Sequence, residues 1–112
     1  MAAIDLEQMT RDIVGAMTAT IGDGSSDIAA FAKGEAAKIA ASVTQIGELR
    51  ASGVIDDEEM ALHLDIQRNA SRAVLMAVKG VGILTAERAV NAALSVATRV
   101  VGQALGIGLL HV

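Results

Sequence analysis

The chain has 112 residues, of which 53% are hydrophobic and only 1% aromatic, and it contains no Pro, Cys, Trp or Tyr. The length predicts a single domain over residues 1–112, because it leaves no room for a second core. The absence of cysteine excludes a disulfide scaffold, a thiol nucleophile and Cys-based metal sites. The net charge of −4 argues against binding to nucleic acid, because a phosphate backbone selects basic proteins.

Helix is the expected secondary structure, because strong helix formers dominate, no proline interrupts the chain, and β-branched residues do not alternate with polar ones. We expect an all-α protein, an antiparallel helical hairpin extended to a three- or four-helix bundle with a long apolar C-terminal helix. The expected helices cover about residues 4–21, 26–52, 56–80 and 85–110. The last two are either separate or continuous, and the glycines between Gly80 and Thr85 slightly favour a break.

The first expected helix is amphipathic. Its apolar residues recur at steps of three and four, which places them on one face; they are Leu6, Met9, Ile13, Met17 and Ile21. Gly22 begins a turn cluster in which a serine can cap the next helix.

The second expected helix carries large apolar residues on one face and alanines on the other, which suits a helix between two neighbours, one of them close. Glu35 interrupts the large-residue face. It is either a rim residue or a buried residue with a specific role, and the rim position is favoured.

The junction to the third helix is the clearest local signal. Gly53 is placed as a C-cap residue with positive φ, and Val54 and Ile55 can pack across the corner. Asp56 and Glu59 have the spacing of a capping box at the start of the third helix.

Glu59, His63 and Gln67 lie four residues apart on the third helix. A metal-binding helical bundle is therefore one candidate, but ferritin-like sites need several inward pairs of a glutamate and a histidine three residues apart, and the chain has none. The preferred interpretation is that His63 packs at a helix interface and bonds to a neighbour. No nucleophile has an evident base partner, so we expect neither an enzyme nor a cofactor or metal site, and no small-molecule substrate is evident.

The C-terminal third has an apolar arc wider than half a helix, which predicts cover from more than one side. Small residues on this helix would let another helix approach closely. The candidate oligomer-interface residues are Gly102, Gly106, Ala89, Ala93, Ala97, Val101 and Leu105. Arg99 lies beside the two glycines and would need a carboxylate partner, for which Glu35 and Glu87 of a neighbouring chain are the candidates.

These patterns favour a non-enzymatic, self-associating structural or assembly protein whose main partner is a second copy of itself. The alternative is a membrane-active helical protein that inserts residues 73–112 as a hairpin or pore-lining segment, for example within a phage or secretion particle. The longest uncharged stretch, residues 100–112, is nevertheless too short to span a bilayer. The N-terminus lacks the basic and apolar regions of a signal peptide, so the expected location is the cytoplasm or the inside of an assembled particle.

Overall fold

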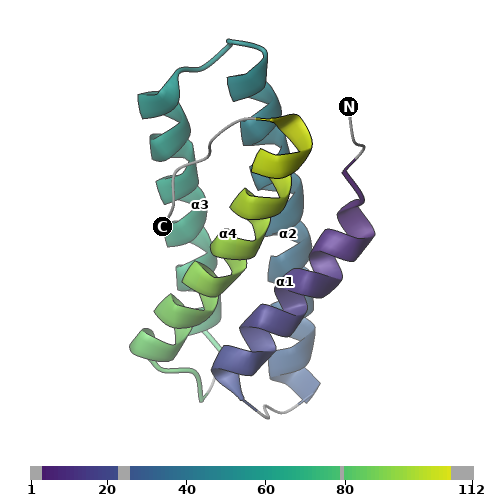
Figure 1. The fold of residues 1–112 in the computed structure, drawn as a ribbon. Helices are drawn as coiled ribbons and strands as arrows, with labels where there is room; N and C mark the ends of the chain where they lie inside the picture. The colour runs from purple at the N-terminus through teal and green to yellow at the C-terminus, as the bar shows by residue number, and fades with distance from the viewer. Residues whose placement is uncertain (1–3, 23–25, 79, 107–112) are drawn as a thin grey trace.

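The computed structural model describes residues 4–22, 26–78 and 80–106. These residues form four helices and no strand: α1 (Leu6–Ile21), α2 (Ser26–Ala51), α3 (Asp57–Met76) and α4 (Ile83–Leu105). Consecutive helices run antiparallel along one bundle (Figure 1). The expected all-α class and helical bundle are confirmed, and the four-helix form with a break before α4 is the one observed.

The helices are arranged around a central pair. α2 and α4 contact each other, and α1 and α3 each pack against both of them. Within the described helices α1 and α3 do not touch, so they lie on opposite sides of the α2 and α4 pair (Figure 1).

Small residues explain why α2 and α4 approach closely. A Cβ atom placed on Gly47 would lie only 2.5 Å from Cγ1 of Val101 and 3.1 Å from Cδ1 of Leu105. A real Cβ atom does not fit at such distances, so a residue without a side chain is required at this point of the crossing.

The core is formed by the apolar faces of all four helices. Its largest fully buried apolar side chains are Met9, Ile13 and Met17 of α1, Ile39 and Val43 of α2, Met60 and Leu75 of α3, and Val90, Leu94 and Val101 of α4. The stripe expected on the first helix is confirmed at its three central residues, whereas its two end residues are exposed or half-buried.

The expectation of a long apolar C-terminal helix is not supported. α4 has 23 residues, ends at Leu105 rather than near residue 110, and is amphipathic. One side is buried against the rest of the same chain, while Arg88, Asn91, Ser95 and Arg99 are exposed. Among the described residues, no helix combines the length and the apolar character that crossing a bilayer requires.

Glycines with positive φ mark most helix ends. Gly22 (φ 87°) ends α1 and donates its N–H to Thr18 O, as expected. Gly53 (φ 81°) turns the chain between α2 and α3, also as expected. At that corner Ile55 is buried but Val54 is exposed, so only one of the two expected apolar contacts forms.

The connection between α3 and α4 differs from the expectation in its bounds. α3 ends at Met76 rather than near residue 80, and Gly80 takes a φ of 93° in the loop. Gly82, not Thr85, is the N-cap of α4, and it provides no side-chain cap. The serine cap expected before the second helix lies partly outside the described residues, as do residues 107–110 of the expected fourth helix.

The capping box at the start of α3 is confirmed in both directions. Asp56 Oδ1 accepts from the N–H of Glu59 at 2.8 Å, and Glu59 Oε1 accepts from the N–H of Asp56 at 3.1 Å. Each bond satisfies a backbone donor that the helix itself leaves free.

Asp56→Ala is expected to lower the free energy of unfolding by about 1 kcal/mol, because it removes the cap of α3. Chemical denaturation followed by circular dichroism measures this loss. Glu58→Ala is the matched control, because Glu58 is an exposed carboxylate in the same first turn and outside the capping box. Equal losses for the two variants would show that charge near the helix end, rather than the cap, is responsible.

Candidate interaction surfaces

The residues expected to form an oligomer interface lie mostly inside one chain. Ala89, Ala93, Ala97 and Val101 are fully buried in the core of the bundle. The close helix approach that their small side chains permit occurs between α4 and its neighbours in the same chain. Self-association through these four residues stays a prediction that would require the bundle to open.

The other three expected residues lie at the end of α4. Gly102 and Leu105 are half-buried, and Leu105 faces Gly47 of α2. Gly106 is exposed and takes the left-handed conformation (φ 68°) as the C-cap, donating its N–H to Gly102 O. Gly106 thus has a conformational role at the helix end that the sequence pattern did not indicate.

The two carboxylates considered as partners for Arg99 already have partners within the chain. Glu87 Oε1 accepts from Arg72 of α3 at 3.3 Å, and Glu35 Oε2 accepts from Lys38 at 3.1 Å. Arg99 itself is exposed. Its charge is therefore solvated and needs no carboxylate from another chain.

Glu35 is buried, contrary to the favoured rim position, with only 3% of its surface exposed. Its neighbour Lys38 keeps most of its own side chain in solvent, so the pair has one buried and one exposed end. A shallow groove of 270 Å³ between α2 and Val74 of α3 lies beside this pair, with Phe31 at its edge. Val74 of α3 lies beside Glu35 in this groove, and the periodicity of α2 alone does not reveal such a neighbour.

His63 is exposed rather than packed at a helix interface. Glu59, His63 and Gln67 do not form one binding site. Glu59 accepts from the N–H of Asp56 at the start of α3, and Gln67 donates to Ser71 at 2.9 Å. In the part of the chain that the structure describes, no three histidine or carboxylate side chains gather as a metal site would need.

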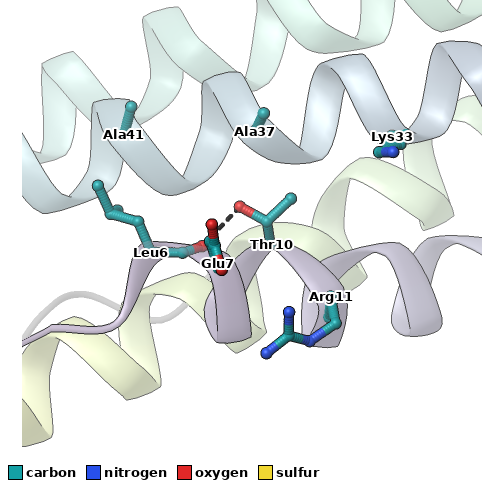
Figure 2. A pocket seen from close by; sticks show the side chains of 7 residues that line it. All are labelled: Leu6, Glu7, Thr10, Arg11, Lys33, Ala37 and Ala41. Carbon is teal, nitrogen blue, oxygen red and sulfur yellow. Dashed lines mark hydrogen bonds between the residues drawn. The ribbon is translucent and has the colours of Figure 1, made fainter.

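An open groove lies between α1 and α2. It measures 640 Å³, and Figure 2 shows the side chains that line it: Leu6, Glu7, Thr10, Arg11, Lys33, Ala37 and Ala41. The alanines of α2 leave the groove shallow. Its Thr10 hydroxyl donates to Leu6 O and Arg11 donates to Gln8, so both polar groups are used within α1.

Two further ion pairs each have a largely exposed aspartate. Arg50 donates its Nε to Asp57 at 2.6 Å across the corner between α2 and α3, and this bond raises the pKa of the guanidinium above its ordinary value. Arg68 pairs with Asp65 one turn away on α3. Pairs with a solvent-exposed partner contribute little to stability.

The outer face of α3 carries large apolar side chains that are exposed. Leu62 and Ile66 are 62% and 65% exposed, although both are large and apolar. They lie on the side of the helix opposite Met60 and Leu64, which face the core. Continuing the same outer face toward the C-terminus, Asn69, Ala70, Ala73, Met76 and Ala77 are also exposed.

α3 therefore has two apolar faces, and the bundle covers only one of them. The second face was not predicted, because this helix was interpreted only through Glu59, His63 and Gln67. The signal was present, since the steps of four and three from Leu62 onward have the spacing of a helix-pairing face and land on apolar residues except at Asn69.

Comparisons with family models, with curated proteins and with solved structures find no match for this chain.

Proposed function

We propose that this protein is a non-enzymatic, self-associating helical protein that acts as a structural or assembly component. The observation that carries the proposal is the outer face of α3, where Leu62 and Ile66 expose about two thirds of their surface in the isolated chain. Burying apolar surface contributes a favourable free energy of about 25 cal/mol per Å². Packing a second apolar surface against the outer face of α3 would therefore stabilise the resulting complex.

Self-association is favoured over insertion into a membrane by the packing of α4. Its apolar side, with Val90, Leu94 and Val101, is already covered by the other helices. Releasing it into lipid would expose the core of α1 and α2 to water. A location in the cytoplasm or inside an assembled particle stays a prediction from the sequence.

Sedimentation velocity and light scattering over a range of micromolar concentrations test the proposal. We expect a reversible dimer or larger species whose fraction rises with concentration. Because the chain has no Trp or Tyr, refractive-index detection is needed in place of absorbance at the usual wavelength. A monomer at every concentration would contradict the proposal.

A further inference from the structure

We infer that two copies of this chain pair through the outer face of α3, with the two helices antiparallel about a two-fold axis. The inference rests on the proposed self-association and names its surface. The outer residues Leu62, Ile66, Asn69, Ala73 and Met76 follow steps of four, three, four and three residues, which are the alternating core positions of a coiled coil. All five are exposed in the single chain, so the face is available to a partner.

Charged residues flank this face on one side only. Asp65 and Arg72 are seven residues apart and occupy equivalent heptad positions beside the core positions. In an antiparallel pair, Asp65 of one copy faces Arg72 of the other, and the two-fold axis repeats this pair. The surface is thus complementary to itself in charge.

A parallel pair lacks this complementarity. There, Asp65 would face the alanine at position 70 of the second copy, and the two charges would not meet. The charge pattern therefore favours the antiparallel orientation and a second copy of this chain as the occupant.

Side-chain sizes agree with the same register. Placing Asp65 opposite Arg72 puts Leu62 opposite Ala73, a large residue against a small one. The same register puts Asn69 of one copy opposite Ile66 of the other, near the two-fold axis. A single asparagine in such a seam fixes register at some cost in affinity.

Because one helix from each copy buries less than a standard interface of about 1,600 Å², we expect a dimer that dissociates in the micromolar range.

Charge reversal tests the pairing directly. Asp65→Arg places two arginines opposite each other at both ends of the pair, and Arg72→Asp places two aspartates there. We expect each variant to dimerise about tenfold more weakly than the natural chain. In an equimolar mixture of the two variants, each reversed residue meets its opposite charge, so sedimentation of the mixture should return to the natural dimer fraction.

The mixture also controls for effects within one chain. Arg72→Asp removes the bond to Glu87, and Asp65→Arg removes the bond to Arg68, but mixing two proteins restores neither bond. Circular dichroism of each variant shows that it is folded. If both variants dimerise like the natural chain, or if their mixture is no stronger than either alone, the antiparallel pairing is wrong. In that outcome the natural chain still dimerises and the proposed function stands, whereas a monomeric natural chain removes both.

A second pair of variants tests the surface independently of charge pairing. Ile66→Glu and Ile83→Glu change isoleucines that are both 65% exposed, one on the outer face of α3 and one at the start of α4. We expect the first to reduce the dimer association constant at least tenfold, because it puts two glutamates beside the axis. The second should leave it unchanged. Equal effects, or a loss only with Ile83→Glu, would place the contact elsewhere.

Discussion

Gly47→Val is expected to lower the free energy of unfolding by about 3 kcal/mol, at the upper end of the cost of overpacking a core. The new side chain would begin 2.5 Å from Cγ1 of Val101, which is itself fully buried and, being β-branched, cannot rotate away. α2 and α4 must separate to admit it. Urea denaturation followed by circular dichroism measures the loss.

Gly34→Ala is the matched control for this effect. Gly34 is an exposed glycine in the same helix, and a Cβ atom there would meet nothing within 4 Å. Alanine should raise the free energy of unfolding by about 0.5 to 1 kcal/mol, because glycine is a poor helix former. Combining Gly47→Val with Val101→Ala should cost less than the sum of the two single changes. Additive losses would show that the two residues do not meet.

Leu94→Ala is expected to lower the free energy of unfolding by about 2 to 5 kcal/mol. Leu94 of α4 is fully buried, and its loss leaves a cavity where the core is made largely of alanine and valine, which have little side chain to move into the space. A bundle of ordinary stability has only about 5 to 15 kcal/mol in total. Thermal unfolding by calorimetry and urea denaturation both measure the change.

Leu84→Ala provides the control, because Leu84 belongs to the same helix and is 59% exposed. The same atoms are removed there with little change in burial, so we expect an effect within about 0.5 kcal/mol. Similar losses at the two positions would mean that α4 does not bury the side on which Leu94 lies.

Local signals in the sequence predicted the fold well. The periodicity of Met9, Ile13 and Met17 identified the buried side of α1, and the spacing of Asp56 and Glu59 identified the start of α3. These features depend on residues within a few positions of one another. A single helix or cap contains all the information that they need.

Features that depend on two helices at once were not predicted. Glu35 is buried in a bundle where α3 packs beside it, and the alanines of α4 are buried against helices of the same chain. The apolar arc of α4 correctly indicated cover on several sides, but no sequence pattern states which chain supplies it. The outer face of α3 was also not predicted, because one helix can carry two apolar faces and only one of them was considered.

The glycine pair at the end of α4 shows how backbone conformation limits a test designed from sequence. Gly102 and Gly106 have the spacing of a close helix contact, and bulky replacements would be the natural experiment. Gly106, however, has a φ of 68°, so a leucine there would be strained whatever lies nearby. A loss of stability in that variant would report the helix end rather than an interface.

The up-and-down order of the four helices gives the molecule a polarity. Because the number of described helices is even, the start of α1 and the end of α4 lie at the same end of the bundle, together with the corner between α2 and α3 (Figure 1). In the proposed dimer the two copies run in opposite directions, so these ends form two opposite poles. The bundle is 41 Å along its longest axis, so the start of α1 in one copy and the start of α1 in the other would lie at opposite ends of the proposed dimer.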